Sequence, residues 1–135
     1  MEDDADALPQ ALEQFTEGAR AQVSGRSVDA LLLAALADLT TRAEQAILHN
    51  RYDREGGLAV ERRARRLAAW AGSSAGGARE RCSRLTQAAA LLALEAPGQA
   101  PHALLPTPRL AAPLAKDILA RRTDFKMEDI KRVKL

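Results

Sequence analysis

The stretch VDALLLAALADLTTRAEQAI at residues 28–47 is the part of the sequence that decides the fold class. Its apolar residues recur every three or four positions, which is the spacing of one face of an α-helix. The residues on this face are Val28, Leu32, Leu36, Leu39, Ala43 and Ile47. Ser27 is suited to cap the start of the helix, and Asp29 is favourable in its first turn. The stretch therefore predicts a helix over about residues 28–51, ~36 Å long, as the main element of the fold.

The same spacing on either side predicts further helices. Their expected ranges are 8–23, 58–71, 78–95 and 111–122, with a final turn at 127–133. Gly56 and Gly57 predict a break before the helix at 58–71, and the prolines within 96–108 predict a long irregular connection. We expect the core to contain Leu32, Leu36, Leu39, Leu67, Trp70, Leu85 and Leu92.

These elements predict an all-α fold, a small antiparallel helical bundle of about five helices. No stretch of the sequence shows the alternation of apolar and polar residues that is typical of a strand. We expect two parts: an acidic N-terminal segment with the first helix at 1–26, and a C-terminal helical-bundle domain at 27–135.

Composition excludes several classes of function. One cysteine and two histidines cannot form an internal disulfide framework or an ordinary four-ligand structural zinc site. No HExxH, GxSxG, Walker or GxGxxG motif occurs. His49 is expected to cap the end of its helix and Cys82 to be a small core residue. We therefore expect no enzyme, no cofactor and no small-molecule substrate.

Charge is unevenly distributed, although the net charge is only +2. Two clusters are strongly basic, one within the helix at 58–71 and one at the C-terminal end. Their members are Arg62, Arg63, Arg65 and Arg66, and Lys126, Lys131, Arg132 and Lys134. Such faces are often simply solvated, but they also suit an acidic protein or anionic lipid headgroups. Nucleic acid is the alternative partner, although no aromatic residues alternate with the arginines to stack on bases.

The C-terminal sequence RRTDFKMEDIKRVKL at 121–135 is distinctive. It resembles the end of the fourth subunit of the conserved oligomeric Golgi complex, where Arg-x-Asp-Phe and a basic residue precede Glu-Asp-Ile-Lys-Arg and a terminal leucine. The matching residues are Arg122, Asp124, Phe125, Lys126, 128–132 and Leu135. Two further blocks, REGGL at 54–58 and SRLTQ at 83–87 followed by LALE at 92–95, resemble that family in the same order. The resemblance covers roughly residues 27–135.

The resemblance implies a non-catalytic component of a Golgi vesicle-tethering complex acting in intra-Golgi retrograde transport. It implies a helical-rod architecture, a peripheral location on the cytoplasmic face of the Golgi membrane or in the cytosol, and partners among the other subunits, SNAREs and their regulators. Structural roles then fall to Gly56, Gly57, Arg84, Asp124, Phe125 and Ile130. In the family the helix after Arg109 has an acidic residue where this chain has Leu114, so the sequence identifies no acidic partner for Arg84.

The charge pattern, rather than the family motif, selects the candidate partner-binding residues. These are Arg62, Arg63, Arg65, Arg66, Lys126, Glu128, Asp129, Lys131 and Arg132. In the C-terminal motif we expect Asp124 to cap the final turn, while Phe125 and Ile130 pack inward. The alternative exposes Phe125 as an anchor for a partner.

Overall fold

The computed structural model describes residues 10, 25–74, 78–105 and 107–135. Within them lie six α-helices and one 3-10 helix, and no strand. In chain order they are α2 (Gly25–His49), α3 (Arg54–Ser74), α4 (Ala78–Leu92), η1 (Pro97–Gln99), α5 (Ala100–Ala103), α6 (Ala112–Leu119) and α7 (Met127–Arg132). The prediction of an all-α fold is confirmed. The helix predicted at 8–23 lies outside the described residues except for Gln10, which is helical.

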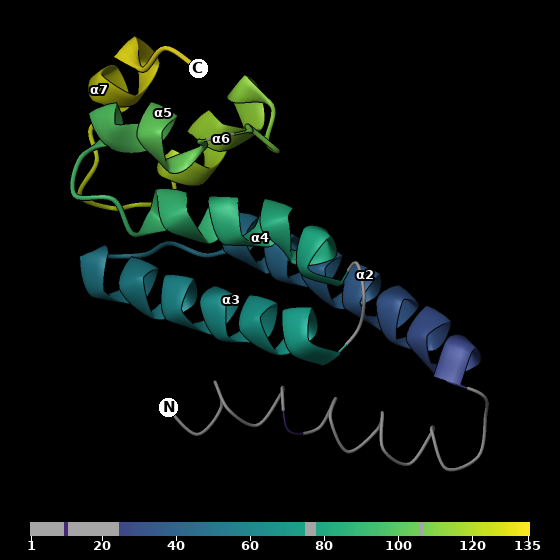
Figure 1. The fold of residues 1–135 in the computed structure, drawn as a ribbon. Helices are drawn as coiled ribbons and strands as arrows, with labels where there is room; N and C mark the ends of the chain where they lie inside the picture. Colours follow the sequence, from purple (N-terminus) through teal and green to yellow (C-terminus); the bar gives the residue numbers. More distant parts are fainter. Residues whose placement is uncertain (1–9, 11–24, 75–77, 106) are drawn as a thin grey trace.

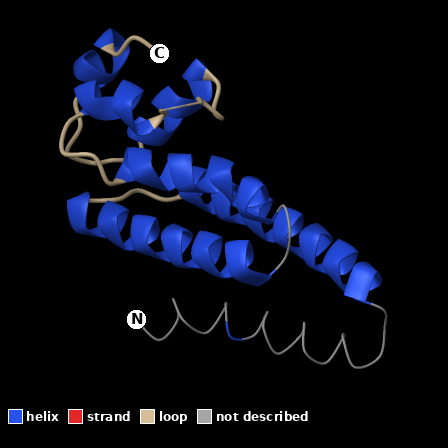
Figure 2. Cartoon of the chain, in the orientation of Figure 1, coloured by secondary structure: helices blue, strands red, loops and turns tan. Residues whose placement is uncertain are grey.

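The other helices pack around α4 (Figure 1). α3 runs antiparallel to α4 along its length, and α2 crosses behind α4. The short helices α5, α6 and α7 cover the opposite side of α4 from α3, and the chain between them consists of loops (Figure 2). The arrangement makes α4 the central helix, in contact with the helices on both sides.

The apolar face of the central helices forms one core. Of the residues predicted for it, Leu32, Leu36, Leu67, Leu85 and Leu92 are buried. Leu39 and Trp70 are only half-buried and pack against the edge of this core. Alanines contribute much of the remaining buried surface of α3 and α4, and such small side chains let two helices approach closely.

The prediction that Gly56 and Gly57 break the chain is wrong, because α3 begins at Arg54 and both glycines lie in its first turn. Asp53 starts the helix: its Oδ1 accepts a hydrogen bond of 2.7 Å from the Gly56 backbone N–H. Gly57 is buried against α4, where a Cβ would lie 1.9 Å from the Leu92 carbonyl oxygen. The absence of a side chain at Gly57 therefore allows the close contact of α3 with the end of α4.

The connection at 96–108 is also more regular than predicted, since it contains η1 and α5. Pro97 and Pro101 lie in the first turns of these helices, where a missing N–H costs nothing. The Gln99 side-chain oxygen accepts hydrogen bonds from the backbone N–H groups of Glu95 and Ala96. Leu104 then turns into the core. The prolines thus shape a compact corner instead of a long irregular loop.

Candidate interaction site

A buried arginine lies where the chain turns from α6 to α7. Arg122 is 1% exposed. Its Nη1 donates hydrogen bonds of 2.7 Å to the carbonyl oxygens of Leu92 and Leu94, just where α4 ends. Carbonyls at a helix C-terminus have no partner within the helix and attract positive charge. Arg122 therefore satisfies the end of α4 with a charged group from a distant part of the chain.

The remaining nitrogens of Arg122 bind Asp124. Nε donates to Oδ1 at 2.8 Å and Nη2 to Oδ2 at 2.7 Å, a two-bond contact that fits the guanidinium fork. The guanidinium carbon also lies 4.2 Å from the centre of the Phe125 ring. Hydrogen bonding from Arg122 is the main reason that the pKa of Asp124 is lowered. Every side of the buried cation thus has a partner.

The prediction that Asp124 caps the last helix is wrong. α7 is preceded by Lys126 at its N-cap position, without a side-chain cap hydrogen bond. Asp124 instead pairs with Arg122, because a buried guanidinium needs a carboxylate more than an exposed helix end needs a cap. Phe125 is half-buried against the core and Ile130 is buried, so the inward packing of both is confirmed.

The segment after α2 pairs with the same turn. The Tyr52 N–H donates to the Arg121 carbonyl at 2.8 Å, and the Thr123 N–H donates to the Tyr52 carbonyl at 2.9 Å. Nearby, Arg54 forms an exposed ion pair of 2.8 Å with Glu95. Residues from three parts of the sequence therefore meet near the end of α4. They are Tyr52 and Gly57, then Leu92, and finally Arg122 and Asp124.

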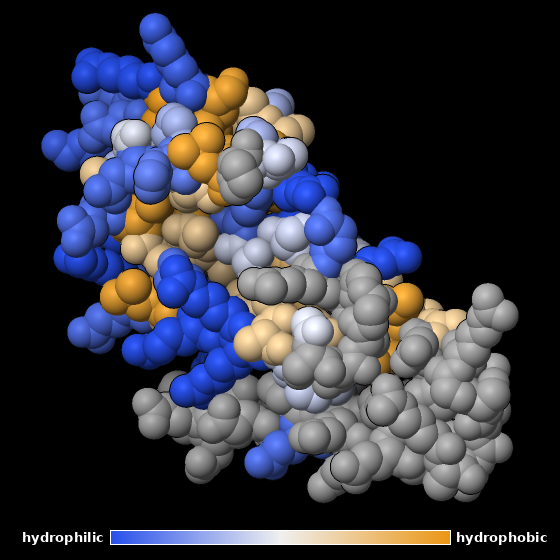
Figure 3. Space-filling model, in the orientation of Figure 1, coloured by the Kyte–Doolittle hydropathy of each residue, from blue (hydrophilic) through white to orange (hydrophobic). Residues whose placement is uncertain are grey.

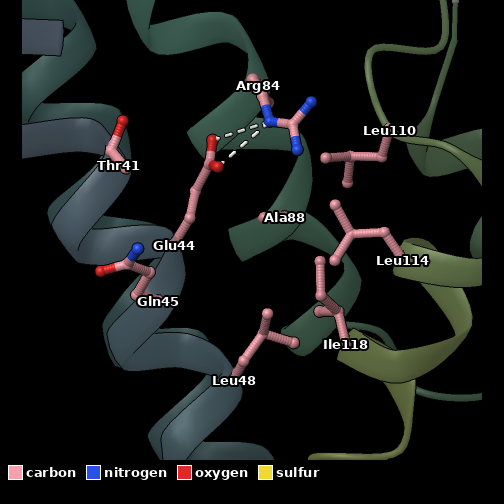
Figure 4. A pocket seen from close by; sticks show the side chains of 9 residues that line it. All are labelled: Thr41, Glu44, Gln45, Leu48, Arg84, Ala88, Leu110, Leu114 and Ile118. Carbon is pink, nitrogen blue, oxygen red and sulfur yellow. Dashed lines mark hydrogen bonds and ion pairs between the residues drawn. The ribbon is translucent and has the colours of Figure 1, made fainter.

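Arg84 has an acidic partner, but not in the helix where the family resemblance would place it. Its Nε lies 3.1 Å from both carboxylate oxygens of Glu44 on α2. Figure 4 shows this pair at the mouth of a hollow of about 180 Å³ that lies among α2, α4 and α6. The far side of the hollow is apolar: Leu110, Leu114 and Ile118. Glu44 is therefore the acidic partner that the sequence did not identify for Arg84.

The four clustered arginines in the middle of α3 are exposed, as the sequence predicts for a solvated or binding face. We call Arg62, Arg63, Arg65 and Arg66 the arginine face. Figure 3 shows hydrophilic side chains gathered over α3. Arg65 forms an i,i+4 ion pair of 3.1 Å with Glu61. Leu58, near the start of the same helix, is 37% exposed.

The second basic cluster lies elsewhere. Exposed positions on or beside α7 are Lys126, Glu128, Asp129, Lys131, Arg132 and Lys134. α7 packs on η1 and α6, whereas α3 packs on α4. Figure 1 shows the two helices on opposite sides of α4, so the structure does not bring the two basic clusters together. They are two separate surfaces.

Other residues singled out from the sequence have structural roles. His49 Nδ1 bonds to the Gln45 carbonyl at 2.7 Å, at the end of α2. Cys82 is fully buried in α4, and burial raises the pKa of its thiol. Sequence reasoning missed the burial of Arg122, because arginine is ordinarily exposed. Its place in an Arg-x-Asp-Phe motif was the one available signal. Among the described helices, none has both the length and the apolar composition to cross a bilayer.

Comparison with known protein families gives a match over most of the chain. The family model described as "Conserved oligomeric Golgi complex subunit 4, C-terminal" matches residues 5–101. This range includes the blocks at 54–58 and 83–95 and ends before the distinctive sequence at 121–135. A search of curated proteins found no match.

Proposed function

Since the chain belongs to the C-terminal family of subunit 4 of the conserved oligomeric Golgi complex, we propose that it works in that complex by protein–protein recognition, without catalysis. Membership of the family makes it a Golgi tethering-complex subunit. The finer role that we propose is intra-Golgi retrograde transport, at the cytoplasmic face of the Golgi membrane. The family match over residues 5–101 is the observation that carries this proposal.

The arginine face is the surface that we assign to the partner. Its four side chains extend from α3, which is fixed along its length against α4. An arginine guanidinium binds a carboxylate through two parallel hydrogen bonds, whereas a lysine offers only a point charge. A face made of arginine alone therefore favours an acidic surface of another protein. Other subunits of the complex are the first candidates, and SNAREs with their regulators are the second.

Co-purification from cell extract tests the proposal. The tagged chain should recover subunits of the tethering complex, quantified by mass spectrometry. The double variant Arg62→Glu with Arg63→Glu should recover at least roughly tenfold less, because opposed like charges cost several kcal/mol. The matched control reverses two exposed arginines of other helices, Arg42 on α2 and Arg81 on α4.

Each outcome has a clear meaning. Loss of partners in the α3 variant but not in the control supports the arginine face. An equal loss in both variants shows that the binding surface lies elsewhere. If wild-type chain recovers no subunits, the tethering role is wrong. If it recovers RNA that nuclease treatment removes, the nucleic-acid alternative is correct.

A further inference from the structure

Every lysine of the chain lies at one end of the molecule. The four are Lys116, Lys126, Lys131 and Lys134, and all belong to the last two helices or their flanks. The arginine face of α3, on the other side of α4, contains no lysine. Because lysine and arginine differ in how they bind anions, this separation suggests that the two basic surfaces meet different partners.

The structure brings two of these lysines together. Lys116 Nζ on α6 lies 3.4 Å from the carbonyl oxygen of Lys131, in the last turn of α7. A cation is favourable at this end of a helix, and the contact brings two lysines from different helices side by side. Arg132 and Lys134 follow directly in the chain. None of these four side chains forms an ion pair with a residue that the structure describes.

Apolar side chains protrude beside these cations. Met127 is 56% and Leu135 is 41% exposed, although both are large. On α7, Met127 and Lys131 lie four residues apart and therefore on the same side of the helix. Glu128 and Asp129 are displaced from Met127 by about 100° and 200° round the helix. Ile130 and Val133 are buried and hold α7 against the rest of the protein.

From this arrangement we infer that the lysine-rich end, formed by Lys116, Met127, Lys131, Arg132, Lys134 and Leu135, binds directly to an anionic lipid surface. Lysines are compact, strongly hydrated charges that attract anionic headgroups without a fixed geometry. Exposed Met127 and Leu135 enter the interface between headgroups and acyl chains, as apolar residues do in peripheral anchors. An acidic protein would instead favour the paired hydrogen bonds that the arginine face offers.

A vesicle flotation assay with the purified full chain tests this inference. The chain should float with phosphatidylcholine vesicles that contain phosphatidylserine and not with pure phosphatidylcholine vesicles. Each cation near the surface contributes roughly a fivefold gain in partitioning. The triple variant Lys131→Gln, Arg132→Gln, Lys134→Gln should therefore lose on the order of a hundredfold. All three residues are exposed, so a thermal melt should show unchanged folding.

The matched control is the triple variant Arg62→Gln, Arg63→Gln, Arg65→Gln, which removes the same charge from α3. It should keep most of its vesicle binding. In a further variant, Met127→Ser should lower the binding that remains at about 1 M salt, where screening has shortened the Debye length to about 3 Å.

Three results would overturn the inference. The first is no binding of wild type to phosphatidylserine vesicles. The second is an equal loss in both triple variants, which would indicate a response to total charge. The third is normal vesicle binding by the lysine-end variant together with loss of co-purified subunits, which would make an acidic protein the partner. The vesicle assay uses the purified chain alone and the co-purification uses cell extract. Lipid binding can therefore be wrong while the tethering role is correct, and lipid binding can be correct while the tethering role is wrong.

Discussion

The two parts of this molecule on either side of α4 are stabilised in different ways. α2, α3 and α4 are 25, 21 and 15 residues long and bury a continuous apolar face. α5, α6 and α7 are only 4, 8 and 6 residues long. Isolated helices of that length are not stable in water. The short helices persist because buried apolar side chains and hydrogen bonds from distant residues attach them to α4 and to one another.

The polar attachments of the C-terminal part are specific. Arg122 binds the end of α4, and Gln87 on α4 bonds to the Thr107 carbonyl and the Arg109 N–H, each at 2.7 Å. Arg109 also pairs with Glu80 at the start of α4. The comparison shows that apolar periodicity builds the long helices, whereas the short ones also depend on polar contacts with distant residues. Each of the following predictions tests that division.

Replacing Arg122 should have the largest effect. Arg122→Met keeps the bulk of the side chain but removes every hydrogen bond, so the buried carbonyls of Leu92 and Leu94 lose their donor. We expect a loss of about 3–5 kcal/mol in the free energy of unfolding, measured by urea denaturation. Hydrogen exchange should accelerate first in α5, α6 and α7. The control Arg132→Met, at an exposed site, should change stability little. Equal exchange in both parts would contradict the division.

Leu36→Ala tests the apolar part. Leu36 is fully buried in α2, and its truncation should cost about 2–5 kcal/mol from lost burial and the cavity left behind. Because α2 contributes to the core that α4 shares, we expect exchange to accelerate in the whole molecule. Leu31→Ala, at a half-exposed position five residues earlier, is the control and should cost much less. An unchanged melting temperature for Leu36→Ala would show that α2 contributes little to the core.

Gly57→Ala tests the close contact of α3 with the end of α4, where Arg122 also binds. The new methyl group would overlap the Leu92 carbonyl oxygen, so α3 and α4 must separate. We expect a loss of about 1–3 kcal/mol in thermal unfolding, typical of overpacking. At Gly98 nothing lies within 4 Å of an added Cβ, so Gly98→Ala should be neutral or slightly stabilising. If the two variants melt alike, the close approach at Gly57 is unimportant.

Acid should weaken the C-terminal part modestly. The pKa of Asp124 is lowered from its ordinary value of 3.8, mainly by the hydrogen bonds from Arg122. The unfolded state therefore binds a proton more readily than the folded state, and the contribution of this pair is fully present above the ordinary pKa. It is lost as the pH falls through the lowered pKa. Asp124→Asn should flatten the profile of unfolding free energy against pH in that acid range.

Much of the helical part could be predicted from the sequence, since apolar residues three or four positions apart, such as Leu32, Leu36 and Leu39, are explained by one regular structure, the α-helix. The boundaries were less certain. Gly56 and Gly57 look like a helix break in a sequence, and only the approach of Leu92 shows that they lie within α3. The candidate binding residues were found from charge, but their separation into two surfaces depends on where α4 lies.

The sequence by itself determined the all-α class, the long helices and five of the seven residues that were predicted for the apolar core, because those properties depend on local periodicity. Only the tertiary structure decided the rest. In the folded structure Arg122 is buried, Asp124 forms an ion pair instead of a helix cap, and Arg84 pairs with Glu44. The physical reason is that each of these contacts joins groups whose pairing depends on the folded geometry. A charge can be buried only when several partners from separate parts of the chain arrive at the same point.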